Sequence, residues 1–386
     1  MKPCWPGWAG GLLAALWCSA AIALDVVAEA EAPIVNDDMT LARLTALRRA
    51  KVQAVEQATE LLQVTTTATP AGMHERATFA PQGRALGARI LGEHVHKGRL
   101  RLTAEVRLEE SGQPATCGER PLRKALVTTF PLRYPEQIRQ GEYMGWPQTT
   151  AEELTRLLNR HGRLLSAPAP TRIPFASVDA APEPERSKQG VPLLTQWASQ
   201  ARAQYVIAGV FRDFGATKKA LLIPERQMVV EAYIYDGISG EMLARREFAQ
   251  QVNFSWQMPK TLTPGSRGFA ESRLGEAYYA LLGEIGSWAE STIGCLPFSA
   301  RVIRAEGGQL HIDVGSDSGI EAGMEFVLTR TATAPVTTDA GDVLAGERIP
   351  VAGVIIKNVQ PRYSVAEITA KKNPPTARPG DVLYGL

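Results

Sequence analysis

The chain has 386 residues, of which 45% are hydrophobic and 21% charged, and its 42 Lys and Arg nearly balance its 40 Asp and Glu. This near-neutral balance argues against nucleic acid as a partner, because binding to phosphates needs a concentrated basic surface. The length suits two or three domains of ordinary size, and no segment beyond the N-terminus is long and apolar enough to cross a membrane.

Residues 1–23 have the pattern of a cleavable export signal. The basic residue Lys2 precedes an apolar run that is shorter than the roughly 20 residues needed to span a bilayer. The run ends in Ala21-Ile22-Ala23, whose small first and third side chains suit a signal peptidase. A buried N-terminal helix is the alternative, but the run lacks the polar face that such a helix would show. We therefore expect a mature, soluble chain that works outside the cytoplasm and has no transmembrane anchor.

Residues 24–112 predict a small α/β domain. A strand is expected at 24–30, and Asn36-Asp37-Asp38 then offers an N-cap to a long helix. Two strands of alternating character follow, around 90–95 and over 100–108, and form a hairpin. Together the elements give a helix packed on a small sheet. The expected buried stripe of the helix consists of Leu41, Leu44, Leu47, Ala54, Ala58 and Leu61.

Residues 117–295 predict an α/β middle domain. The expected elements are, in chain order, a strand at 125–130, a helix at 151–159, an extended proline-rich surface loop at 168–192, a helix at 191–201, a strand at 205–211, a hairpin of strands 227–235 and 242–250, and a helix at 269–293. The strand at 205–211 is apolar on both faces, so we expect it near the centre of a covered sheet.

Residues 297–386 predict an all-β domain. The segment shows no good helix, and short β runs alternate with glycine turns, which is typical of a small barrel or sandwich. The clearest runs are 309–314, 324–328, 351–359 and 364–368. The predicted fold class of the whole chain is therefore a multidomain α+β protein.

Cys117 and Cys295 are the two cysteines that remain after removal of the expected export signal, and they bracket the middle domain. Two cysteines in an oxidising compartment most simply form one disulfide. Two free, buried thiols are the alternative.

No set of residues predicts a catalytic, cofactor or metal site. His94 and His96 share a strand face but lack a nearby third ligand, so a surface pair is favoured over a zinc site. Ser316 lies in a Gly-Ser-Asp-Ser-Gly run but is not centred and enters no helix, so a β-turn is favoured over a nucleophile. Adjacent glutamates point apart, and no phosphate loop or dinucleotide fingerprint is present. The sequence predicts that the chain is not an enzyme.

Several short runs occur in a characteristic order. They are EAPIVN at 31–36, ALRRA at 46–50, AVEQA at 54–58, Cys117-Gly118, ALVTTFP at 125–131, YVIAG at 205–209, GMEF at 323–326 and PGDVL at 379–383. Together they resemble the flagellar assembly protein T family, over three consecutive domains. That family forms the H ring of polar, sheathed flagella, and its middle domain is similar to the N-terminal domain of the Tol-Pal translocation protein TolB.

The resemblance implies a non-enzymatic periplasmic scaffold of the flagellar basal body, near the outer membrane, that assists outer ring assembly and stator incorporation. The implied partners are basal-body ring proteins and motor-associated periplasmic proteins. A periplasmic adaptor of envelope transport or secretion is the alternative, and a cell-wall hydrolase is a third hypothesis for which no acid can be named. Aromatic anchors often carry the binding energy of such surfaces, and the candidates expected to be exposed are Tyr143, Trp146, Phe254, Trp256 and Tyr363.

Overall fold

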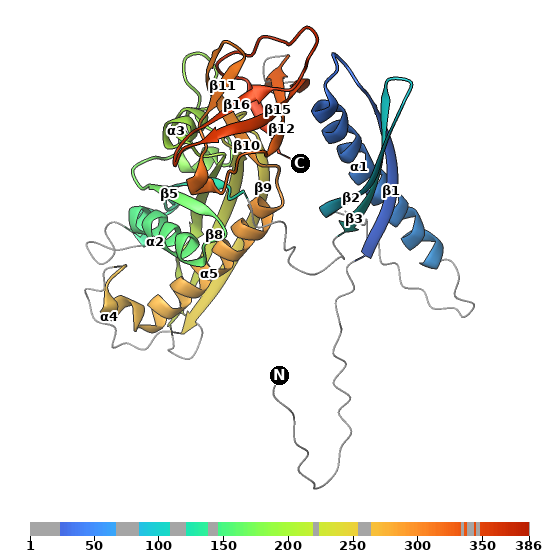
Figure 1. The fold of residues 1–386 in the computed structure, drawn as a ribbon. Helices are drawn as coiled ribbons and strands as arrows, with labels where there is room; N and C mark the ends of the chain where they lie inside the picture. Colours follow the sequence, from blue (N-terminus) through green and yellow to red (C-terminus); the bar gives the residue numbers. More distant parts are fainter. Residues whose placement is uncertain are drawn as a thin grey trace, which may run out of the picture.

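A computed structural model describes residues 24–66, 85–108, 121–137, 146–218, 224–253, 264–332, 336–337, 343–344 and 348–385. These residues form a three-stranded sheet with one long helix, a six-stranded sheet with helices on both faces, and a closed barrel (Figure 1). The predicted mixed α+β architecture is confirmed. The expected export signal, residues 1–23, lies outside the described residues.

The N-terminal sheet has the strand order β1-β3-β2, with every pair antiparallel. Its elements are β1 (Leu24–Pro33), β2 (Ala85–His96), β3 (Arg99–Leu108) and the helix α1 (Met39–Thr66). Alternate residues of β3 are buried, as the period of a half-covered strand requires. The predicted stripe of α1 is confirmed at Leu44, Ala54 and Ala58, which are buried. The residues packed on the sheet are mainly alanines, because short side chains let the helix lie close to the strands. These alanines are Ala42, Ala46, Ala50, Ala54 and Ala58.

The middle sheet has the strand order β5-β4-β6-β8, with β7 and β9 also paired to β8. Its strands are β4 (Lys124–Thr128), β5 (Leu165–Ala169), β6 (Tyr205–Asp213), β7 (Ala216–Lys218), β8 (Pro224–Asp236) and β9 (Met242–Asn253). β4 runs parallel to β5 and β6, and the pairs β6–β8 and β8–β9 are antiparallel. The first seven residues of β6 are all buried, which confirms its predicted central position.

Helices cover both faces of the middle sheet (Figure 1). One face is covered by α2 (Trp146–His161) and α5 (Arg273–Gly294), with the short α4 (Arg267–Ala270) beside α5, and α3 (Leu193–Ala201) covers the other. The proline-rich segment was predicted to be a surface loop, and that prediction is wrong in part. It begins within β5, and Phe175 in it is buried against Tyr233 with ring centroids 5.7 Å apart.

The C-terminal strands close into a barrel in the order β10-β11-β16-β15-β12-β17, so the barrel is confirmed and the sandwich excluded. Its strands are β10 (Ser299–Glu306), β11 (Gln309–Ile312), β12 (Glu325–Thr331), β15 (Arg348–Val359), β16 (Ser364–Ile368) and β17 (Val382–Tyr384). The remaining elements are the pair β13 (Val336–Thr337) and β14 (Val343–Leu344), and the short 3-10 turns Pro135–Gln137, Val178–Ala180 and Ser316–Ser318.

Among the helices of the described residues, none combines the length and the apolar character that crossing a membrane requires.

Candidate functional site

Trp146 is fully buried, so the expectation that it is exposed is wrong. Helix α2 begins at Trp146, five residues before the predicted start, and this places the indole on the face that packs against the sheet. Its ring lies 4.9 Å from Phe214, 5.4 Å from Phe269 and 4.8 Å from Tyr278, all in edge-to-face geometry. Trp146 is therefore a core residue of the middle domain and offers no surface to a partner.

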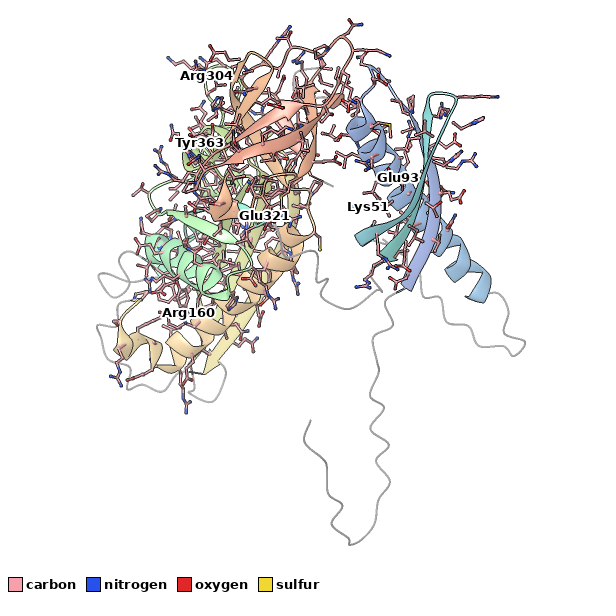
Figure 2. All side chains as sticks on the ribbon, viewed as in Figure 1. Lys51, Glu93, Arg160, Arg304, Glu321 and Tyr363 are labelled. Carbon is pink, nitrogen blue, oxygen red and sulfur yellow. The ribbon has the colours of Figure 1, made fainter. Side chains whose placement is uncertain are left out.

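Tyr363 is 42% exposed and lies in the turn between β15 and β16 of the barrel (Figure 2). Its ring stacks on His311 with centroids 6.2 Å apart, which holds the aromatic face at the barrel surface. Tyr363 remains a candidate contact. Tyr143, Phe254 and Trp256 lie outside the described residues.

Cys295 directly follows the last residue of α5. Cys117, its predicted partner, lies outside the described residues, so the pairing of Cys117 with Cys295 stays a prediction.

The predicted surface histidines His94 and His96 are both exposed on β2, opposite Arg101 and Arg99 of β3. Within the described ranges, no three His, Cys, Asp or Glu side chains gather where they could hold a metal ion. Ser316 lies in a 3-10 turn that follows β11, as the β-turn interpretation expects.

The first polar cluster joins α1 to the barrel. We call it the clasp and define it as Asp38, Thr40 and Arg43 of the N-terminal sheet and its helix, with Glu325, Gly353 and Thr369 of the barrel. Asp38 is 1% exposed and caps α1, because its Oδ1 accepts from the Leu41 amide at 2.9 Å. The same carboxylate accepts from the Gly353 amide at 2.7 Å and from the Thr369 hydroxyl at 2.6 Å. A helix cap therefore serves at the same time as a link between domains.

Arg43 forms the second half of the clasp. Its guanidinium donates to Glu93 of β2 at 2.6 Å and to Glu325 of β12 at 3.0 Å (Figure 2 labels Glu93). Thr40 Oγ1 also donates to Glu325, at 3.1 Å. The hydrogen bond to Glu93 and the pairing with Glu325 raise the pKa of Arg43, so the charge that bridges the two domains persists at every physiological pH.

Gly353 lets the helix end approach the barrel closely. A Cβ atom at this position would lie 2.6 Å from Thr369 Oγ1, 2.7 Å from the Leu41 amide nitrogen and 2.7 Å from Thr40 Cβ. Contacts this short do not occur in folded proteins, so any larger residue would push α1 away from β15.

The second polar cluster joins the middle domain to the barrel. Arg301 of β10 donates to the carbonyls of Ala203 at 3.2 Å and Gly237 at 2.9 Å, and pairs with Asp313 at 3.3 Å. Three further middle-domain side chains donate to carbonyls on the segment that enters the barrel. They are Tyr205 to Pro297 at 2.7 Å, Gln204 to Ser299 at 3.0 Å, and Arg123 to Leu296 at 2.8 Å. These hydrogen bonds connect the middle domain directly to the barrel.

A third cluster surrounds Glu231 on β8, which is 5% exposed. Arg212 donates to it at 2.6 Å, the Tyr233 hydroxyl donates at 2.7 Å, and Arg245 of β9 forms a further ion pair. Burial by itself would raise the pKa of the Glu231 carboxyl, but the hydrogen bonds from Tyr233 and Arg212 outweigh it, and the pKa lies below its ordinary value. An acid held ionised between two arginines fits strand cross-linking better than proton transfer.

These observations define the class of the protein: a multidomain α+β chain in which three polar clusters tie domains and strands together. Residues 115–264 match the family model described as flagellar assembly protein T, middle domain. The middle segment of the chain therefore matches the flagellar assembly protein T family, and the recognition predicted from the sequence is confirmed for that segment. The matched family implies a role in flagellar assembly.

Similar solved structures include a hypothetical protein from Chlamydia trachomatis, 17% identical, with a TM-score of 0.32, covering 44% of this chain and 98% of that one. A PelC dodecamer from Paraburkholderia phytofirmans is 12% identical, with a TM-score of 0.28 and coverage of 45% and 89%. A protein from Xanthomonas campestris is 12% identical, with a TM-score of 0.29 and coverage of 47% and 90%. Similarities this low carry no argument about fold or function. Among curated proteins, none matches this chain.

Proposed function

We propose that this protein is a non-enzymatic periplasmic scaffold of the flagellar basal body, located in the H ring near the outer membrane. In this role it assists assembly of the outer ring and incorporation of the stator into the motor. The observation that carries the proposal is the match of residues 115–264 to the middle domain of flagellar assembly protein T.

The domain contacts support a scaffold. Arg301 and its neighbours fix the barrel to the middle domain, and the clasp fixes α1 to the barrel. A chain that transmits position between rings needs such fixed joints, whereas an enzyme would need an acid, base or nucleophile aimed into a cavity. Glu231, a strongly buried acid, is held between arginines instead.

The proposed organisation follows the sequence: an N-terminal domain at 24–112, a middle domain at 117–295 with a fold similar to the N-terminal domain of TolB, and a C-terminal domain at 297–386. The proposed partners are basal-body ring proteins and motor-associated periplasmic proteins. Tyr363 is the aromatic contact candidate that the structure shows on the surface.

The proposal is tested with a strain that lacks the gene and with an affinity-tagged chain expressed from its own locus. We expect the deletion strain to lose motility and outer ring structure, and the tagged chain to purify with basal bodies. Recovery of the tagged chain with envelope transport proteins and without basal bodies would favour the adaptor hypothesis. Normal flagellar rotation in the deletion strain would contradict the scaffold.

A further inference from the structure

The N-terminal sheet has two open margins of opposite chemical character. Strands β1 and β2 each pair with β3, and no described strand lies on the outer edge of either (Figure 1). Edge strands of ten and twelve residues are unusually long to leave unpaired, because exposed backbone groups are a template for another chain. The exposed backbone groups of these two edge strands are therefore able to bind a partner strand.

The two margins carry opposite charge. On the sheet face opposite α1, all the charged residues of β1 are acids, namely Asp25, Glu29 and Glu31. On β2 the same face presents Arg89, His94 and His96. The acid of β2, Glu93, points to the other side, where Arg43 binds it.

Ion pairs to β3 leave charges of opposite sign at the two margins. Arg89 pairs with Glu105 of β3 at 2.9 Å, so this rung ends on a positive charge at the β2 margin. At the β1 margin two rungs end on negative charge, with Asp25 bound to Arg107 and Glu31 bound to Arg99 and Arg101. In a contact between two copies, a positive margin meets a negative margin when β2 of one copy meets β1 of the other.

Apolar exposure supports the same contact. Ile90, Leu91 and Val95 on β2 are 37%, 49% and 50% exposed, and Val27 on β1 is 55% exposed. Ile90 and Val95 share rungs with inward-facing residues of β3, so they belong to the α1 side of the sheet but are left uncovered beyond the reach of the helix. A neighbouring copy at this margin would cover them with its own β1 and α1.

We propose that β2 of one copy pairs with β1 of a second copy, so that the N-terminal sheets join head to tail. Since β1 and β2 are both antiparallel to β3, they run in the same direction, and the new pair is parallel. If the rungs continue, Arg89 lies beside Val27 of the next copy, between Asp25 and Glu29, and His94 lies beside Glu31. This inference rests on the proposed function, because the contact would join neighbouring copies within the proposed ring.

Charge also excludes the two-fold alternative. Pairing β2 with β2 would bring Arg89, His94 and His96 against the same residues, and pairing β1 with β1 would bring acid against acid. A contact between two different margins of the same domain is heterologous, and such contacts close into a ring when the rotation between copies allows it.

Cross-linking in intact cells tests the pairing. A chain that carries Val27→Cys and Arg89→Cys is treated with a short bifunctional maleimide, and a ladder of multimers is expected on a denaturing gel. The matched control carries Val27→Cys and Arg48→Cys, because Arg48 is an exposed arginine on the helix, away from both margins. A single dimer band from Arg89→Cys alone, or a cross-link to a different protein, would overturn the proposal.

Charge exchange gives an independent measurement. Arg89 is replaced by cysteine in the first chain and cannot be varied there, so the second ladder uses Glu31→Cys with His94→Cys, which share a rung in the proposed pairing. Glu29→Lys reduces this ladder about three- to tenfold, as expected when attractive cross-strand contacts become repulsive, and adding Arg89→Glu restores it. Failure of the second change to restore the ladder would count against the pairing.

The two proposals fail in different ways. An absent ladder with a motility defect in the deletion strain would overturn the strand pairing and leave the scaffold. A ladder in cells whose motility and basal bodies do not depend on the gene would overturn the scaffold and leave the pairing.

Discussion

Replacing Asp38 tests whether the clasp holds the N-terminal domain to the barrel. The Asp38→Ala change removes the cap of α1 and leaves the Gly353 amide and the Thr369 hydroxyl without their acceptor. Losing a helix cap costs about 1 kcal/mol, and leaving a buried donor unsatisfied costs about 1–3 kcal/mol. Because these effects overlap and relaxation recovers part of them, we expect a loss of about 2–4 kcal/mol in the free energy of separating α1 from the barrel.

Hydrogen exchange measured by mass spectrometry on peptides of β15 reports this loss directly. Each 1.4 kcal/mol changes an equilibrium tenfold, so exchange at the Gly353 amide should accelerate by about 30- to 700-fold. Asp38→Asn keeps one side-chain oxygen that can accept a hydrogen bond, but it replaces the other oxygen with an NH2 group that cannot. The acceleration of exchange should therefore lie between that of Asp38→Ala and wild type.

The matched control is Asp37→Asn, one residue earlier. Asp37 is 52% exposed, lies 3.4 Å from Lys372 and has a positive φ that asparagine tolerates. An exposed ion pair is worth about 0–1 kcal/mol, so little change is expected. Equal exchange at Gly353 in the Asp38→Ala and Asp37→Asn variants would refute the clasp.

Three further predictions concern the middle domain. Trp146→Ala should destabilise it by about 3–5 kcal/mol in denaturant unfolding because a buried indole is lost, whereas Tyr363→Ala on the barrel surface should change stability little; equal effects would contradict the assigned burial. Cys295→Ser and Cys117→Ser should each cost about 2–5 kcal/mol, and the double variant no more than either, as for one shared bond; an additive loss would show separate roles. Glu231 has a lowered pKa, so its contribution is fully present above its ordinary value of 4.5 and is lost as pH falls through the lower folded value. Between those limits wild type should lose more stability on acidification than Glu231→Gln, and parallel pH profiles would argue against the arginine pairing.

The sequence predicted most strands because their patterns are local. The run at 205–211 is apolar on both faces, and only a central, covered strand buries both. The choice between barrel and sandwich was left open, since it depends on the pairing of β10 with β17, whose short strand gives almost no periodic signal. The start of α2 was predicted too late because Trp146-Pro147 does not resemble a capped helix start. For this reason Trp146 was wrongly predicted to lie in an exposed loop.

The clasp could not be predicted from the sequence. The run Asn36-Asp37-Asp38 was predicted to offer the cap of α1, but the other partners of Asp38, Gly353 and Thr369, lie more than 300 residues further along the chain. Nothing local distinguishes Gly353 from a turn glycine, although its role is to allow close approach. In the sequence, Glu231 looks like any polar residue of an alternating strand. It is buried because Arg212 and Arg245 on neighbouring strands bind its carboxylate.

Subtomogram averages of basal bodies in wild-type, deletion and complemented cells test most directly whether this chain is a structural part of the flagellar basal body. We expect ring density near the outer membrane to disappear in the deletion strain and to return on complementation with the wild-type chain. Ring density that is identical in all strains would contradict this role.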